Sequence, residues 1–126
     1  MTPARYILRV HQRTARDWAL TWYDENEAVI DLTGYEALFQ VRQSPSSPLL
    51  GELRSDEGQI ILGDTSPNIR VEMGRTFLEA LPTRNQDREW SYGLKLYQPG
   101  APNMSTITLL QDHFYIQASV PRQPDE

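Results

Sequence analysis

A polar turn that leads directly into a strictly alternating segment places the strongest constraint on the fold. Residues 31–34 read Asp-Leu-Thr-Gly, and the glycine can take the positive φ that a sharp change of direction often needs. In the next segment Ala37, Phe39 and Val41 fall on one face. A slip of one residue would turn Phe39 outward, so this period fixes which face meets the core. The pattern predicts a half-buried strand over residues 36–42.

The same alternation recurs along most of the chain. Residues 77–81 break it, because their apolar positions follow helical spacing before Pro82, and they predict one short helix near residues 75–81 that plugs one end of the fold. A change of alternation between Leu110 and His113 predicts a bulge there. Turns at this spacing are typical of an all-β sandwich or barrel. The further predicted strands are residues 5–11, 18–23, 28–30, 49–54, 59–62, 68–73, 87–97 and 105–120.

The inward faces of these segments predict the hydrophobic core. Two of the three tryptophans alternate within one segment, which is the pattern of core residues. The predicted core residues are Trp18, Leu20, Trp22, Phe39, Val41, Ile69, Val71, Trp90, Tyr92, Leu94, Phe114 and Ile116.

The length and composition limit the class of protein. A chain of 126 residues is expected to form one domain over residues 1–126, with a frayed tail at residues 121–126. The absence of cysteine excludes disulfides, a thiolate nucleophile and a zinc-thiolate site. No apolar run is long enough to span a bilayer, and the first twelve residues lack the apolar centre of a signal peptide. We therefore expect no membrane association and no secretion by the general route.

Charge is unevenly distributed along the chain. The net charge of −5 argues against nucleic acid as a partner. Residues 1–16 carry four arginines and no acid, so the remaining chain holds 12 − 4 = 8 basic and 17 acidic residues, a net of −9. Two interpretations stay open: a solvated arginine face on an edge strand, or a basic arm that docks on an acidic neighbour such as another copy of the chain. These arginines are Arg5, Arg9, Arg13 and Arg16.

No set of residues in the sequence matches a known catalytic or metal-binding pattern. His11 and His113 are the only histidines and fall on different predicted strands, so a shared metal or acid-base site is not expected. An acidic turn could offer oxygen ligands to calcium, but it lacks a calcium-loop spacing and is predicted to be solvated. We expect no enzymatic activity, no cofactor and no bound metal. The turn residues are Asp24, Glu25, Asn26, Glu27 and Asp31.

A succession of short motifs runs along almost the whole chain. These motifs are Arg13 to Trp18, Asp31-Leu32-Thr33-Gly34, Phe39-Gln40-Val41-Arg42, Gly58-Gln59-Ile60-Ile61-Leu62, Trp90-Ser91-Tyr92-Gly93-Leu94 and a last strand near Phe114. Their order resembles a family of small immunoglobulin-like β-sandwich proteins encoded in the structural modules of tailed bacteriophages. At the entry to the second strand the family typically has an Arg-Gly-Asp-like motif, whereas this chain has Thr-Ala-Arg-Asp at residues 14–17.

The resemblance implies assembly and no chemistry. It predicts an immunoglobulin-like antiparallel β-sandwich of about seven to nine strands. The implied function is that of a structural component of a tailed-phage virion: a tail-tip, baseplate, adaptor or capsid-surface protein. Such a protein is made in the cytoplasm of the bacterial host and associates with other virion proteins and with itself in a symmetric assembly. Stiff proline-rich loops at residues 44–48 and 99–103 would lose little entropy on docking. The candidate interface residues are Arg5, Arg9, Arg13, Arg16, Pro45, Pro48, Pro99 and Pro102.

A carbohydrate-binding module that contacts glycans of the host surface is the alternative function. Such sandwiches place aromatic side chains on an exposed face, and three tyrosines have outward positions in the predicted strands and turns. The three tryptophans have inward positions, which argues against this alternative. The candidate tyrosines are Tyr23, Tyr35 and Tyr97.

Overall fold

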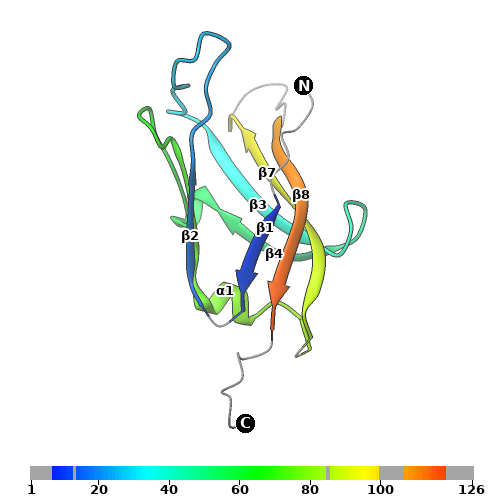
Figure 1. The fold of residues 1–126 in the computed structure, drawn as a ribbon. Helices are drawn as coiled ribbons and strands as arrows, with labels where there is room; N and C mark the ends of the chain where they lie inside the picture. The colour runs from blue at the N-terminus through cyan, green and yellow to red at the C-terminus, as the bar shows by residue number, and fades with distance from the viewer. Residues whose placement is uncertain (1–6, 13, 85, 100–106, 119–126) are drawn as a thin grey trace.

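The computed structural model describes residues 7–12, 14–84, 86–99 and 107–118 as two facing β-sheets (Figure 1). The five-stranded sheet has the spatial order β1 (Leu8–His11), β8 (Ile107–Gln117), β7 (Arg88–Tyr97), β3 (Glu36–Arg42) and β4 (Leu49–Arg54). The three-stranded sheet has the order β2 (Arg16–Leu20), β6 (Ile69–Met73) and β5 (Ile60–Leu62). Two short helical turns complete the described structure, η1 (Ser55–Glu57) and α1 (Arg75–Glu79).

The connections between the sheets give the fold an immunoglobulin-like topology. The chain crosses from one sheet to the other between β1 and β2, between β2 and β3, between β4 and β5, and between β6 and β7. The three-stranded sheet thus corresponds to the B, E and D strands of an immunoglobulin domain, and β8, β7 and β3 correspond to G, F and C. The prediction of an all-β immunoglobulin-like sandwich with one short helix is confirmed.

One strand pair differs from the antiparallel arrangement that the sequence predicts. β1 lies at the edge of the five-stranded sheet and pairs parallel with β8, with Leu8 opposite Phe114 and Val10 opposite Ile116. All other described strand pairs are antiparallel. Neighbouring strands joined by a hairpin must run antiparallel, but β1 and β8 come from opposite ends of the chain, so no turn fixes their relative direction.

Four aromatic rings join the two sheets at the centre of the core. Phe39 on β3 stacks on Tyr92 of β7, with ring centroids 5.3 Å apart. Trp18, from the facing sheet, meets both rings edge-on at 6.1 and 5.9 Å. Phe114 on β8 completes the cluster at 6.2 Å from Phe39. This geometry is the one that aromatic pairs prefer, and it explains why the alternation of these strands places the rings inward.

Most predicted core residues are buried, and two are only partly so. Leu20 and Trp22 are half-buried and pack against the core cluster. Their positions differ from the prediction because β2 ends at Leu20, so the segment after it leaves the sheet before Trp22. The alternating segment 36–42 forms β3 as predicted, with its inward residues at most 1% exposed.

The short helix α1 closes one end of the sandwich, as Figure 1 shows and as the sequence predicts. A Cβ at Gly51 of β4 would stand 2.7 Å from a methyl carbon of Leu81 and 3.0 Å from the ring of Phe77, so the glycine permits this close approach. The Gln12 side chain donates hydrogen bonds to the carbonyls of Leu78 and Leu81 at 3.0 and 2.9 Å. These bonds satisfy carbonyl groups at the end of the helix.

The buried side chain of Asn68 holds the segment between β2 and β3 in place by hydrogen bonds to its backbone. Asn68 is 1% exposed and accepts a hydrogen bond from the Trp22 N–H at 2.8 Å. Its amide donates to the carbonyls of Trp22 and Ile30 at 3.2 and 2.9 Å. The predicted strand at residues 28–30 is wrong, because this segment makes only a single bridge, between Tyr23 and Val29. The side chain of Asn68 therefore makes the hydrogen bonds to the backbone of residues 22 and 30 that a longer pair of strands would otherwise make.

The bulge in β8 lies earlier than the sequence predicts. Leu94 pairs with Leu110 and Lys95 pairs with Thr108, so Leu109 is the extra residue. Leu109 and Leu110 are consequently both buried, at 4% and 7% exposure. The sequence pattern predicted the bulge between Leu110 and His113, where the alternation of apolar residues visibly changes. The pattern does not reveal that Leu109 is the extra residue, because Leu109 and Leu110 are both apolar. A second register shift lies beside Gly51, as predicted for β4.

Candidate assembly surface

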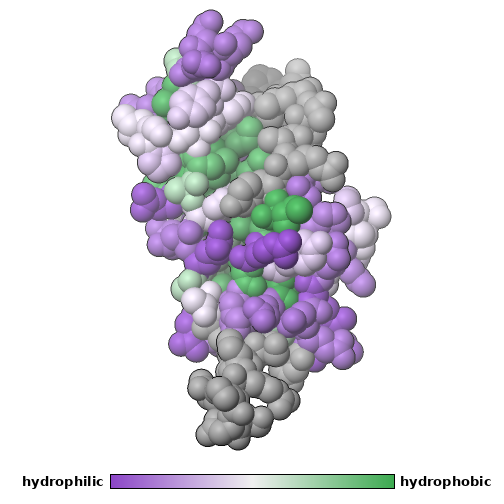
Figure 2. All heavy atoms as spheres, viewed as in Figure 1, coloured by the Kyte–Doolittle hydropathy of each residue, from purple (hydrophilic) through white to green (hydrophobic). Residues whose placement is uncertain are grey.

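The outward side chains of the five-stranded sheet are predominantly polar. Those of β3, β7 and β8 alternate with buried neighbours along each strand. Figure 2 shows the side of the molecule that carries β1 and β2, where hydrophilic residues cover much of the surface and apolar atoms show between them. A sheet face of this kind is solvated on one side and packed on the other. Two separate polar networks lie on it, one at each edge.

The first network, here called the Tyr115 cluster, joins Arg9 of β1, Glu89 of β7, and His113 and Tyr115 of β8. The guanidinium carbon of Arg9 lies 4.6 Å from the centre of the Tyr115 ring, a cation–π distance. The Tyr115 hydroxyl donates a hydrogen bond of 3.0 Å to the Glu89 carboxylate. His113 Nδ1 lies 3.2 Å from the same carboxylate oxygen. Side chains from three strands are thus connected in one row across the sheet.

An open groove of about 360 Å³ lies along this cluster at the β1 edge. Arg9, Glu89 and Tyr115 line it together with Asp87 and Gln117. Asp87 accepts a hydrogen bond of 2.9 Å from the Ala118 N–H, which fixes the end of β8 beside the groove. Arg88 lines the groove as well, so the groove has Arg9 at β1 and, at the start of β7, the two carboxylates of Asp87 and Glu89 on either side of Arg88 in the sequence.

The carboxylate of Glu89 changes the acidity of the tyrosine. The hydrogen bond from Tyr115 to Glu89 raises the pKa of Tyr115 above its ordinary value, with smaller contributions from partial desolvation and from the negative charge of Glu89. Arg9 acts in the opposite direction but is outweighed. Tyr115 is consequently a neutral hydrogen-bond donor across the physiological pH range. The arrangement presents the Arg9 guanidinium and the Tyr115 ring together at the edge of the sheet.

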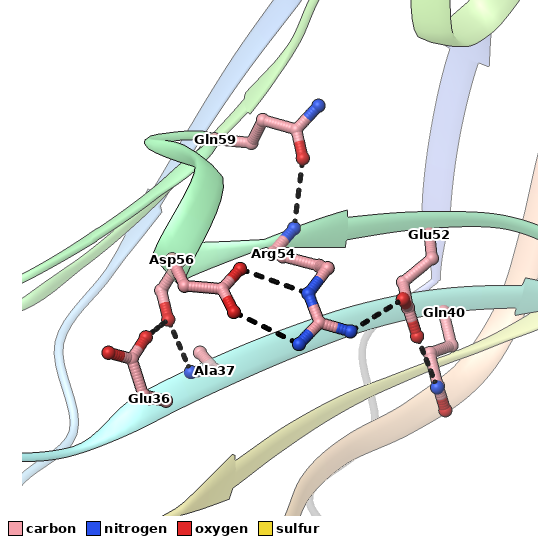
Figure 3. A network of polar contacts seen from close by, with 8 residues as sticks. Glu36, Ala37, Gln40, Glu52, Arg54, Asp56 and Gln59 are labelled. Carbon is pink, nitrogen blue, oxygen red and sulfur yellow. Dashed lines mark hydrogen bonds and ion pairs between the residues drawn. The ribbon is translucent and has the colours of Figure 1, made fainter. Parts of the chain in front are cut away.

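The second network lies at the β4 edge, around the point where the chain passes into η1 (Figure 3). Arg54 donates to both carboxylate oxygens of Asp56, at 2.9 and 3.0 Å, and to Glu52 at 3.3 Å. Gln40 donates to the other oxygen of Glu52 at 2.7 Å. The Arg54 hydrogen bonds hold the pKa of Asp56 below its usual value, while those to Asp56 and Glu52 raise the pKa of Arg54. We call this set the Arg54 network.

A serine joins the Arg54 network to the backbone of β3. The Ser55 hydroxyl accepts a hydrogen bond of 2.7 Å from the Ala37 N–H and donates one to the Glu36 carboxylate. Gln59 accepts a bond of 3.0 Å from the Arg54 N–H (Figure 3). Apart from the amide oxygen of Gln40, these polar groups have partners within the chain. The network therefore stabilises the crossing from β4 toward β5 and leaves little bonding capacity for a ligand.

The candidate arginines do not share one surface. Arg9 is exposed on β1 in the Tyr115 cluster. Arg16 is half-buried on β2 in the other sheet, opposite Met73, and its Nε has no hydrogen-bond partner in the described part of the chain. Arg5 and Arg13 lie outside the described residues. Only Arg9 is thus placed on the candidate surface.

The candidate prolines lie in two separate loops. Pro45 and Pro48 are exposed in the loop between β3 and β4, where the Ser47 N–H donates to the Ser44 carbonyl at 3.0 Å. Pro99 is exposed just after β7, and Pro102 lies outside the described residues. The interface role of the loops at residues 44–48 and 99–103 stays a prediction.

The candidate tyrosines do not form a common platform for a sugar. Tyr23 is 52% exposed, at the bridge to Val29. Tyr35 is half-buried and packs against the core. Tyr97 ends β7 opposite Glu36. The glycan alternative stays a prediction, and the positions of these rings give it no support.

The histidines and the acidic turn have separate local roles. His11 on β1 lies opposite Gln117, four residues along β8 from His113, a separation of roughly 13 Å. Asp24 accepts bonds from the Asn26 and Ala28 N–H groups at 2.8 and 3.0 Å. Among the described residues, no group of three or more His, Cys, Asp or Glu side chains is arranged to hold a metal ion.

The Asp31 carboxylate fixes the turn before β3. It accepts hydrogen bonds from the Thr33 hydroxyl at 2.6 Å and from the Thr33 N–H at 2.9 Å, and these bonds lower its pKa. Glu25 and Glu27 are exposed. The carboxylate that begins each turn is therefore occupied in holding the backbone, which is the usual role of aspartate there.

Glu89 and Tyr115 are the residues that the sequence did not single out. The inward positions of Phe114 and Ile116 imply that Tyr115 points outward, and Glu89 has the same outward position on its strand. Their contact depends on the register between β7 and β8, in which Glu89 lies opposite Tyr115. The position of Arg9 beside Tyr115 depends in addition on the parallel pairing of β1 with β8. Neither register can be derived from alternation.

Comparisons with known proteins add little. No protein-family model matches the sequence, and no curated protein matches it. A solved structure of a family 123 glycoside hydrolase from Clostridium perfringens is similar over 97% of this chain, with 10% sequence identity and a TM-score of 0.30. The chain spans 24% of that protein, and a TM-score this low does not establish a common fold. In the described residues no helix is long and apolar enough to cross a membrane.

Proposed function

We propose that this chain is a structural protein of a tailed-bacteriophage particle that works by assembly with other virion proteins and with copies of itself. The observation that carries the proposal is the Tyr115 cluster beside its groove. Arginine and tyrosine are enriched among the residues that dominate binding energy at protein interfaces. Here the two are in contact at 4.6 Å on a sheet edge, beside a groove of about 360 Å³.

The charges of the groove suit a symmetric contact. Arg9 lies on one side, and the exposed carboxylates of Asp87 and Glu89 lie on the other, together with the half-buried Arg88, whose Nε donates to the Thr83 carbonyl. In a two-fold contact the basic side of each copy meets the acidic side of its partner, so one surface is complementary to itself. A neighbouring virion protein with the same alternation of charge would fit equally.

The motifs of the sequence resemblance support the proposal from a second direction. Gly34 and Gly58, which belong to two of these motifs, have φ values of 89° and 78°. Side chains with a Cβ rarely adopt such values, so the backbone requires glycine at both turns. The motifs of residues 58–62 and 90–94 lie on β5 and β7 and the turn before β5. The motifs that carry the resemblance to phage structural proteins thus lie in strands and turns of the sandwich.

Mass spectrometry of purified virions tests the proposed role directly. We expect the chain in intact particles at a fixed ratio to a major virion protein, and we expect particles to lack an identifiable layer when its gene is deleted. Complete absence of the chain from intact particles would contradict the proposal.

A charge reversal on the groove tests the assembly surface. Arg9→Glu should weaken self-association about tenfold or more, because it places like charges across the contact. Arg70→Glu is the matched control, since Arg70 is an exposed residue of β6 in the other sheet. Sedimentation equilibrium over a range of concentrations measures both. A chain that stays monomeric and instead retains glycan would favour the carbohydrate-binding alternative.

A further inference from the structure

A polar hollow of about 150 Å³ lies on the outer face of the five-stranded sheet, further along β7 than the Tyr115 cluster. Gly93 occupies its centre, with Gln40 of β3 opposite on one side and Gln111 of β8 opposite on the other. Pro45 from the β3–β4 loop lines its rim. Three neighbouring strands and one loop therefore contribute to a single depression.

The hollow exists because position 93 has no side chain. A Cβ at Gly93 would come no closer than 3.9 Å to the Leu110 carbonyl oxygen and to Cε of Lys95. These are ordinary contacts, so neither crowding nor backbone strain explains a glycine here. The same distance shows that the Lys95 side chain extends over the space that a larger residue would fill. The glycine leaves room for an external group beside the lysine.

One wall of the hollow carries an acceptor that the protein does not use. The Gln40 amide nitrogen donates to Glu52, so the amide oxygen lies on the side away from Glu52 (Figure 3). This oxygen is buried and accepts no hydrogen bond from the described residues. A buried acceptor without a donor is unfavourable, so turning the Gln40 amide oxygen toward the hollow would be favourable when a ligand there offers a hydroxyl or N–H group.

Two side chains that line the hollow, one from β3 and one from β7, carry positive charge. Arg42 and Lys95 line the hollow, and no acidic residue does. Arg42 donates one of its N–H groups to the Ser47 carbonyl at 2.9 Å, which leaves others for a ligand. The Lys95 ammonium forms no ion pair or hydrogen bond with the described residues. Two cations without an acidic neighbour in the same hollow are suited to a carboxylate.

We propose that this hollow binds a small carboxylate that also bears a hydroxyl group. The carboxylate lies between Lys95 and Arg42, and the hydroxyl donates to the amide oxygen of Gln40. A free hydroxy acid and the acidic sugar at the end of a glycan share this chemistry. The only aromatic residue that lines the hollow, Tyr92, is 2% exposed, so recognition depends on hydrogen bonds and charge rather than on ring stacking. The proposal is independent of the assembly role, which concerns the β1 edge.

Titration of the isotopically labelled protein, followed by amide NMR, tests the proposal. The probes are D-glucuronate, its methyl glycoside as a model of a glycan end, and glycolate as a free hydroxy acid. We expect the Gly93 backbone amide and the side-chain amides of Gln40 and Gln111 to shift. Acetate, which lacks the hydroxyl, and glucose, which lacks the carboxylate, should each bind about tenfold or more weakly, since each loses one polar contact to the site.

Three variants locate the binding. Lys95→Gln should weaken binding about tenfold or more, because it removes a charge-assisted contact. Arg70→Gln removes one positive charge from the other sheet and should leave binding unchanged. Gly93→Val extends a side chain into the hollow and should abolish binding, while dispersed amide spectra show that the fold persists.

A second measurement follows the chemical modification of Lys95. Lys95 is the only lysine among 126 residues, so acylation by an amine-reactive reagent, read by mass spectrometry on the peptide that contains Lys95 and thus apart from the α-amino group, reports on this one side chain. Bound glucuronate should slow its modification, and glucose should not. The proposal is overturned if no probe shifts the three amides, if Lys95→Gln binds like the unchanged chain, or if acetate binds as tightly as glucuronate. If glycolate binds and the methyl glycoside does not, the ligand is a free acid rather than a glycan end.

Discussion

The two polar networks on the outer face of the five-stranded sheet contain similar residues but have different roles: one stabilises the chain locally, and the other lies at the candidate interface. In the Arg54 network the partners lie two residues apart in sequence or directly opposite each other in register, as Arg54 does to Asp56 and Gln40 to Glu52. In the Tyr115 cluster, Glu89 and Tyr115 come from the consecutive strands β7 and β8, and Arg9 comes from β1, which is distant from both in the chain. The first network is closed on itself, and the second borders an open groove.

The difference shows that polar residues alone do not identify a binding surface. A closed network of local contacts stabilises the segment that carries it, and in the Arg54 network its charged groups bond to one another rather than to a partner. A cluster assembled across an edge keeps one side accessible. The position of the groove, and not the number of charges, therefore separates the candidate interface from the structural network.

The largest effect is expected from the core beneath both networks. Trp90 on β7 is 6% exposed and lies opposite Phe114. Trp90→Ala should reduce the free energy of unfolding by about 3–5 kcal/mol, because it leaves a cavity in the packed interior. Urea denaturation followed by circular dichroism measures the change. A loss below about 1 kcal/mol would mean that the interior is less tightly packed there than the contacts indicate.

A smaller effect is expected in the Arg54 network. Ser55→Ala leaves the Ala37 N–H without its acceptor and Glu36 without its donor, and it should cost about 1–3 kcal/mol of unfolding free energy. Ser46→Ala is the control, because Ser46 is exposed in the β3–β4 loop. Self-association should not change in either variant. If Ser55→Ala altered association instead, the β4 edge would belong to the interface.

The smallest effect is expected in the Tyr115 cluster and concerns acidity. Glu89→Gln removes the charged acceptor of the tyrosine hydroxyl, so the pKa of Tyr115 should fall toward its ordinary value of about 10. Because folding raises this pKa, the associated stability is fully present below pH about 10 and is lost as the pH rises through the folded-state value. Carbon NMR of the tyrosine rings against pH measures the shift. Glu72→Gln, on the other sheet, should leave it unchanged.

The sequence predicted those features that depend on neighbours along the chain. Alternation places Phe39, Val41 and Val71 in the core, and helical spacing before Pro82 identifies α1, because both signals arise within a few residues. The outward position of Arg9 follows in the same way. The network at Asp31 is local as well, since an aspartate two residues before a threonine is a turn signal.

The features that the sequence did not predict depend on register between distant strands. The parallel pairing of β1 with β8 brings Arg9 to Tyr115, and the pairing of Gly93 with Gln40 and Gln111 creates the hollow. The four arginines near the start of the sequence look like one group, yet Arg9 and Arg16 lie in different sheets. A run of charge in sequence is therefore no evidence for a patch on the surface.

The parallel pairing of the first and last described strands also determines how the domain responds to mechanical load. Because β1 and β8 run in the same direction, a pull on the chain before β1 and after β8 acts along the two strands in opposite senses. The hydrogen bonds between them are then loaded in shear, and they must rupture together instead of opening one after another from an end. Resistance to such a pull is set by the unfolding rate rather than by equilibrium stability, so a small domain of this topology can withstand tension along its chain.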